Sequence, residues 1–119
     1  IISLNIYKIM ATHYTIEPDI KYEELSVQKV LITLPLIKVF KEHGIHIKNL
    51  TSAKIDPDGA PCPLSKMDDM KKMFDENTPL PPIVIKQHKA TEYYSIIDGR
   101  HRFAMSIIVG YSIIPFVLS

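Results

Sequence analysis

A short segment near residue 100 limits the possible structures of this chain more than any other part of the sequence. A run typical of a β-strand, 93–97, stops at Asp98-Gly99, and a helical run begins at once and continues to about Val109. Three basic residues stand where this helix begins: Arg100, His101 and Arg102. A helix N-terminus carries a partial positive charge, so cations there cost a few tenths to about 1 kcal/mol. The pattern indicates that an anion, most often a phosphate, is bound at this end of the helix.

The residues of this turn allow two interpretations. Gly99 can adopt a positive φ and let a ligand approach the backbone closely. Asp98 could cap the helix, hold an arginine or help to hold a metal ion. In the alternative interpretation, Asp-Gly is an ordinary turn pair and the basic side chains are solvated. We favour the anion site, because the unpaired N–H groups of the first helical turn also favour a negative ligand.

Composition limits what kind of anion is expected. The net charge is +1, so no overall field draws the chain to nucleic acid or to a membrane, and anion binding must be local.

With 119 residues, 46% of them hydrophobic, the chain can bury a core as one domain without disulfides. The single cysteine, Cys62, fits a reducing, cytoplasmic location. No apolar stretch is long enough to span a bilayer, and we expect no membrane partner.

Hydrophobic periodicity and turn signals predict the other elements. Thr33 is expected to cap a helix and Gly44 to end it, whereas 23–32 fits a helix or a strand equally well. The expected helices are 34–43, a segment from a capping-box-like start at Ser65 to about Glu76, and 101–109. The expected strands are 1–9, 45–50, 83–85, 93–97 and 112–118. This order predicts an α+β fold, a small mixed sheet with helices packed on it.

Four segments carry a resemblance to a known family: 82–85, 94–102, Gly110 and 114–117. In this order they resemble the ParB/sulfiredoxin superfamily over residues 45–119. At the turn, ParB proteins carry a Gly-Glu-Arg-Arg type motif, sulfiredoxins Gly-Gly-Cys-His-Arg, and free-serine kinases of the superfamily Asp-Gly-His-His-Arg. The string here, Asp-Gly-Arg-His-Arg, is most similar to the last. Residues 1–44 match nothing in the family and are expected to form an N-terminal extension, a strand plus a helix.

The resemblance implies a nucleotide-phosphate site, with ATP or another nucleotide as ligand, with or without Mg²⁺. The turn residues would contact the phosphates: Gly99, Arg100, His101 and Arg102. Lys66 stands near the place where sulfiredoxins have a phosphate-binding lysine, although it is equally an exposed first-turn lysine. Phosphoryl transfer or nucleotide hydrolysis is the expected activity. Its arginines would neutralise developing charge, His101 would donate a hydrogen bond or proton, and Asp98 would position Mg²⁺ or an arginine.

Departures from the family pattern argue against sulfiredoxin activity and leave the base of a serine kinase without a clear counterpart. The position of the sulfiredoxin catalytic cysteine is Arg100 here, so a cysteine-dependent sulfiredoxin is not expected, and Cys62 lies elsewhere, in a proline-rich link. The hydroxyl residues that sulfiredoxins use fall on Asp69 and Met73. The acidic base of the serine kinases does not align clearly. Its nearest candidates are Asp56 and Asp58, which also suit an Asp-Pro-Asp-Gly turn.

A second class of function uses the same residues. A DNA-binding module, or a ParB-like nuclease, would hold a backbone phosphate at the Asp98–Arg102 turn. The two classes differ in salt dependence, because affinity for DNA falls steeply with salt. The histidines and acidic residues lack the ligand spacing of a structural zinc site, so no resident metal is expected.

Overall fold

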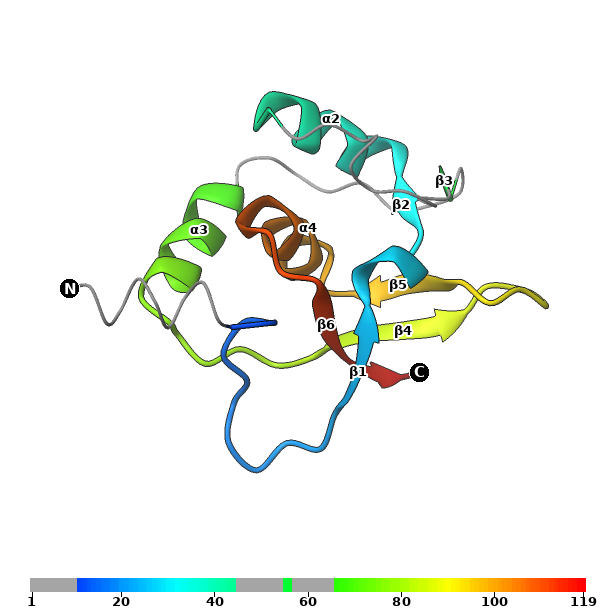
Figure 1. Ribbon diagram of the computed structural model, residues 1–119, viewed down its shortest axis with the longest axis horizontal. Helices are drawn as coiled ribbons and strands as arrows, with labels where there is room; N and C mark the ends of the chain where they lie inside the picture. The colour runs from blue at the N-terminus through cyan, green and yellow to red at the C-terminus, as the bar shows by residue number, and fades with distance from the viewer. Residues whose placement is uncertain (1–10, 45–54, 57–65) are drawn as a thin grey trace.

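The computed structural model describes residues 11–44, 55–56 and 66–119. The strands expected over 1–9 and 45–50 lie outside these ranges, as do Asp58, Cys62 and Ser65. Within them, the chain forms a four-stranded sheet with helices on one side, and a separate pair of short strands (Figure 1).

The sheet is mixed, with the order β1-β6-β4-β5. Its strands are β1 (Glu23–Ser26), β4 (Ile83–Gln87), β5 (Tyr94–Asp98) and β6 (Ile113–Leu118). β1 runs antiparallel to β6 and β4 antiparallel to β5, whereas β4 and β6 are parallel. The connection from β5 to β6 is a helix that crosses β4. The expected α+β fold is confirmed.

The segment 23–32, which fitted a helix or a strand, contains both kinds of structure. It forms β1, a 3-10 turn η1 (Val27–Lys29) and the start of β2 (Ile32–Thr33), which pairs in parallel with β3 (Ile55–Asp56). Long-range pairing with β6 makes 23–26 a strand. Four side chains from 14–32 also belong to the hydrophobic core: Tyr14, Val27, Val30 and Ile32.

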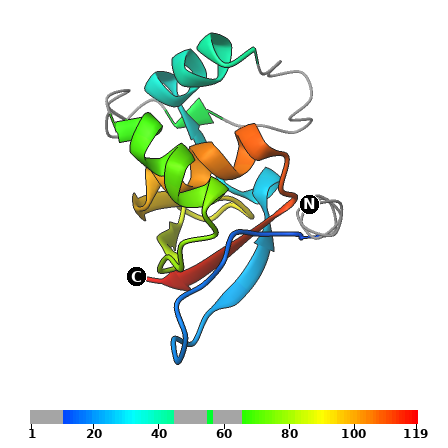
Figure 2. The ribbon, with the colours of Figure 1, turned by 90° about the vertical axis from the view of Figure 1, so that its left-hand side faces the viewer.

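The described residues form three α-helices on one side of the sheet: α2 (Leu34–Glu42), α3 (Met67–Asp75) and α4 (Arg100–Val109). α4 lies between α2 and the sheet (Figure 2) and contacts α2, α3 and β4. Half of its residues are therefore buried and all but Val109 are at least partly buried, as its nearly all-round apolar sequence predicts. Among the described residues, no helix has the length and apolar character needed to cross a bilayer.

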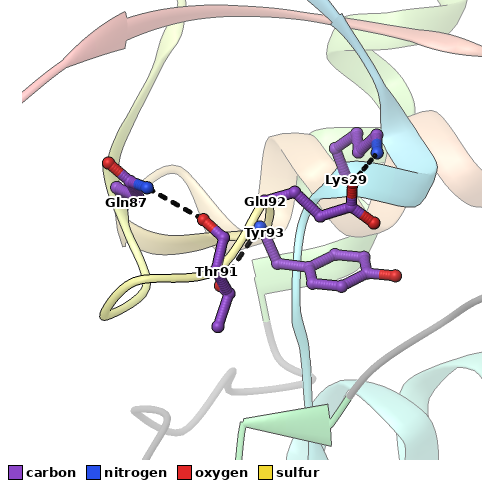
Figure 3. Close-up of polar contacts among 5 residues, drawn as sticks. All are labelled: Lys29, Gln87, Thr91, Glu92 and Tyr93. Carbon is purple, nitrogen blue, oxygen red and sulfur yellow. Dashed lines mark hydrogen bonds and ion pairs between the residues drawn. The ribbon is translucent and has the colours of Figure 1, made fainter.

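The β4–β5 hairpin, which leads into the basic turn, is fixed by η1 and by its own tip. Lys29 Nζ lies 3.1 Å from Glu92 Oε2 and 5.7 Å from the ring centroid of Tyr93. At the tip, Gln87 Nε2 donates to the Thr91 carbonyl oxygen at 2.9 Å, and the Tyr93 N–H donates to Thr91 Oγ1 at 3.2 Å (Figure 3). These contacts order the start of β5, the strand whose last residue is Asp98.

Candidate anion site at the start of helix α4

The turn between β5 and α4 is a single residue long. Gly99 separates Asp98, the last residue of β5, from Arg100, the first of α4, and it adopts φ 104° and ψ 26°. Its carbonyl oxygen accepts the first helical hydrogen bond, from the Phe103 N–H at 2.9 Å. Gly99 has no side chain, and none caps this helix. The first N–H groups of α4 therefore lack the side-chain acceptor that most helices place there.

Gly99 is required by space as well as by backbone conformation. A Cβ at this position would lie 2.7 Å from Arg102 Nη2 and 2.7 Å from Ile83 Cγ2. Both distances are well inside van der Waals contact. The guanidinium of Arg102 thus lies directly over the backbone of the turn, which is possible only because residue 99 is glycine.

Each of the two arginines makes one polar contact through its Nη2 atom, yet each retains a donor without an acceptor. Arg100 Nη2 donates to the Ile96 carbonyl oxygen at 3.1 Å, and Arg102 Nη2 lies 3.4 Å from Asp98 Oδ2. The Nε atoms of both arginines are buried and have no hydrogen-bond partner within the described structure. A buried donor left unpaired costs about 1–3 kcal/mol, and more on a charged group. Two such donors at one helix end indicate a site for an acceptor-rich ligand.

The contact between Arg102 and Asp98 is too weak to fix the arginine. The Asp98 side chain is 74% exposed, whereas that of Arg102 is 14% exposed, and the pair is at the long end of hydrogen-bond distances. Ion pairs of this kind contribute about 0–1 kcal/mol. Most of the Arg102 side chain is instead enclosed by the protein.

Tyr14 enters the core from the N-terminal part of the chain. Its side chain is buried, and its hydroxyl donates to the Pro81 carbonyl oxygen at 2.7 Å. Burial raises the pKa of Tyr14 well above its ordinary value, and the charge and hydrogen bonding of Arg102 partly oppose that rise. Sequence reasoning missed this residue, because no local pattern in 11–22 indicates that it is buried in the core against Pro81.

The other predicted residues fall into two groups. His101 lies within the first turn of α4 and is half-buried, and its side chain or backbone already interacts with another group. Lys66 precedes α3, is exposed and makes no capping hydrogen bond, and the described structure shows no contact between it and the turn. Its role toward phosphate stays a prediction. Asp56 belongs to β3. Where the chain is described, no cluster of three or more His, Cys, Asp or Glu is placed to hold a metal.

A cavity of about 400 Å³ lies elsewhere in the described structure, and none of the turn residues 98–102 lines it. Its walls come from Ala11, from 13–20 and from Tyr22, Asn77 and Tyr111.

Two solved structures share the fold. One is the C-terminally truncated chromosome-partitioning protein ParB from Caulobacter crescentus complexed with CTP-gamma-S, with a TM-score of 0.52 and 16% identity. It aligns with 83% of this chain and 44% of its own length. The other is a conserved hypothetical protein from Pyrococcus furiosus, with a TM-score of 0.52, 14% identity, and coverage of 89% and 34%. The chain thus spans less than half of either protein.

The sequence comparisons agree with the fold. No curated protein matches the chain. A family model, that of the ParB N-terminal domain, matches residues 37–119, which is more than half of the chain and includes the whole of the Asp98–Arg102 turn. The chain therefore belongs to the ParB N-terminal domain family.

Proposed function

We propose that the Asp98–Arg102 turn binds the phosphates of a nucleotide. The observation that carries the proposal is the pair of buried, unpartnered Nε–H groups of Arg100 and Arg102 at the uncapped start of α4. Phosphate oxygens are strong acceptors, and they suit both guanidinium groups and the free N–H groups of a helix N-terminus. A phosphate at this place would satisfy the buried donors and offset the positive charge of the helix end.

Each residue of the turn has a part in this arrangement. Gly99 keeps the backbone open to the ligand and leaves space for the Arg102 guanidinium. Arg100 and Arg102 bind phosphate oxygens, and His101 donates a further hydrogen bond. Asp98, largely exposed beside Arg102, is available to orient that arginine or a Mg²⁺ ion that accompanies the nucleotide. We expect the reaction, if the ligand turns over, to be phosphoryl transfer or nucleotide hydrolysis.

Two observations favour a nucleotide over DNA as the ligand. The ParB structure from Caulobacter crescentus, which shares this fold, holds a nucleotide analogue. The net charge of +1 gives this chain little of the broad positive field that proteins use to bind the DNA backbone.

The proposal is tested by calorimetric titration with ATP, ADP and CTP, each with and without Mg²⁺. We expect at least one nucleotide to bind the wild type and to lose all measurable binding in Arg102→Ala. The matched control is Lys38→Ala, which removes an equal charge from an exposed position on α2 and should leave affinity unchanged. A thermal unfolding curve establishes that Arg102→Ala is folded. A nucleotide that binds should then be screened for kinase and hydrolase turnover.

Two results would overturn the proposal. Unchanged affinity in Arg102→Ala would remove the turn from the binding site. Binding of no nucleotide, together with DNA affinity that falls steeply between low and physiological salt, would replace the nucleotide with backbone phosphate.

A further inference from the structure

The cavity of about 400 Å³ has no part in the proposed nucleotide site, and its size lies within the range of small-molecule pockets. Most of its wall is the loop that leads into β1 (Figure 1). This loop precedes the family match of 37–119, so membership of the family assigns it no role. The chemistry of the wall therefore has to indicate what the cavity binds.

Backbone hydrogen bonds fix the loop that forms most of the wall. The Glu17 N–H donates to the Leu80 carbonyl oxygen at 3.0 Å, and the Leu80 N–H donates to the Thr15 carbonyl oxygen at 2.9 Å. The Ile113 N–H donates to the Thr12 carbonyl oxygen at 3.2 Å, which ties the same loop to β6. The wall is thus built before a ligand arrives, and binding requires little further ordering of the loop.

The charged side chains of the wall are acidic. Glu17 and Asp19 line the cavity, and its described lining residues include no lysine or arginine. His13 also lines it, but its Nε2 lies 3.3 Å from the Glu24 carboxylate, which would neutralise any charge on the imidazole. The neighbouring Lys21 lines a different groove. The cavity therefore presents a net negative charge to a ligand.

Two helices end at the cavity and add to this negative charge. Tyr111 follows Gly110, the C-terminal cap of α4, and Asn77 lies just beyond the end of α3. A helix C-terminus carries a partial negative charge that basic residues usually offset. The last turn of α3 has Lys72, whereas that of α4 has no basic residue. The start of α4 thus suits an anion and its end suits a cation.

Aromatic rings make up the rest of the polar and apolar lining. Tyr14, Tyr22 and Tyr111 line the cavity, and Phe74 packs behind two of them, with centroids 5.4 Å from Tyr14 and 6.2 Å from Tyr111. Aromatic rings attract organic cations through their faces and cover alkyl groups. A metal ion is less suited, because no group of three or more His, Cys, Asp or Glu within the described ranges is placed to hold one.

We propose that this cavity binds a small organic cation, an alkylated ammonium ion. Its charge is held by the carboxylates of Glu17 and Asp19 at the C-terminal end of α4, and its alkyl groups lie against the tyrosine rings. The proposal does not depend on the nucleotide site, because none of the turn residues 98–102 lines the cavity.

The first test uses the wild type alone. Choline is titrated into nitrogen-15-labelled protein and compared with its uncharged carbon isostere, in which a tert-butyl group replaces the trimethylammonium group. We expect choline to shift the amide signals of the lining residues saturably, and the isostere to bind about tenfold more weakly. Sodium chloride at matched ionic strength should not produce these shifts. No choline shift at the cavity, or equal affinity for the isostere, would overturn the proposal.

Substitutions then test the assigned residues. Glu17→Gln and Asp19→Asn should each raise the Kd of choline about threefold, and the double variant about tenfold. The matched control is Glu42→Gln, which removes an exposed carboxylate at the end of α2 and should leave Kd unchanged. Wild-type affinity in the folded double variant would remove both carboxylates from the site.

Tyr22, which is 37% exposed, tests the aromatic part of the wall. Tyr22→Phe keeps the ring and should bind choline as the wild type does, whereas Tyr22→Leu should raise Kd about threefold. Equal affinities of these two variants would contradict a contact between the cation and this ring.

Arg102→Ala separates this inference from the proposed function. We expect this variant to lose nucleotide binding and to bind choline with wild-type affinity. If no nucleotide binds the wild type but choline does, the proposed function fails and the cation site stands. If nucleotides bind and choline does not, the cation site is overturned and the nucleotide site stands.

Discussion

The starts of α2 and α4 solve the same problem in opposite ways. Both helices are about the same length and both pack into one core. At α2, Thr33 Oγ1 accepts from the Leu36 N–H at 3.3 Å, and Pro35 stands in the first turn, where a missing N–H is harmless. At α4, Gly99 supplies no side-chain acceptor, and the next three residues are basic. One helix end is completed by its own side chain, and the other is left incomplete.

The difference shows which helix end is available to a ligand. α3 gives an intermediate case, because it also lacks a side-chain cap but carries Asp68 and Asp69 in its first turn. Those carboxylates complement the partial positive charge at the N-terminus of α3. Among these three helices, only α4 combines an uncapped start with a first turn that carries basic residues and no acidic ones. Its uncapped start, rather than its basic charge alone, is the feature on which the proposed anion site rests.

The largest expected effect comes from filling the space over the α4 turn. Gly99→Ala places a Cβ 2.7 Å from two side-chain atoms at a positive φ, and we expect it to destabilise the fold by about 3 kcal/mol and to abolish anion binding. Gly110→Ala is the matched control, since φ is 98° there and no atom lies within 4 Å. It should cost about 1 kcal/mol, from backbone strain alone. Urea unfolding measures both, and equal losses would remove the close-approach argument.

A smaller effect is expected at the other helix start. Thr33→Ala removes the cap of α2 and should lower the free energy of unfolding by about 1 kcal/mol, measured by urea denaturation. Nucleotide affinity should not change, because α2 completes itself without a ligand. Thr33→Ser retains the acceptor and should restore most of the loss. A change of affinity in Thr33→Ala would contradict the contrast between the two helix starts.

The smallest effect on stability is expected at Asp98. Its side chain is 74% exposed and lies 3.4 Å from Arg102, so Asp98→Asn should alter the free energy of unfolding by less than about 0.5 kcal/mol. If Asp98 holds Mg²⁺ with the nucleotide, the same variant should reduce the Mg²⁺ dependence of nucleotide affinity. A variant that is as dependent on Mg²⁺ as the wild type would leave Asp98 with a role toward Arg102 alone.

Helix ends and the strand-to-helix turn, which depend on neighbouring residues, could be predicted from the sequence. The Thr33 cap, the end of α2 just before Gly44 and the short strand-to-helix connection at Gly99 all follow from residue types at their own positions. The expected fold and its family were confirmed by the sheet and by the family match. The turn itself is local, which is why its residues could be proposed together from sequence.

What the sequence did not predict depends on contacts between distant segments. Residues 23–26 are a strand because they pair with β6, and their own pattern did not distinguish strand from helix. Tyr14 lies in a polar stretch without regular periodicity, and only the fold brings its hydroxyl to Pro81. A lysine such as Lys66 can be aligned with a family position, but alignment alone does not establish contact with the turn.

The place of β6 in the sheet has a consequence for how the protein is synthesised. β6 follows every other described element in the chain, yet it lies between β1 and β4 in the sheet. During translation, β1 leaves the ribosome before β6 and cannot form its hydrogen bonds with β6 until that strand has emerged. Pairings of such long sequence separation form slowly and leave strand edges exposed meanwhile. We therefore expect the nascent chain to rely on chaperones until β6 has left the ribosome.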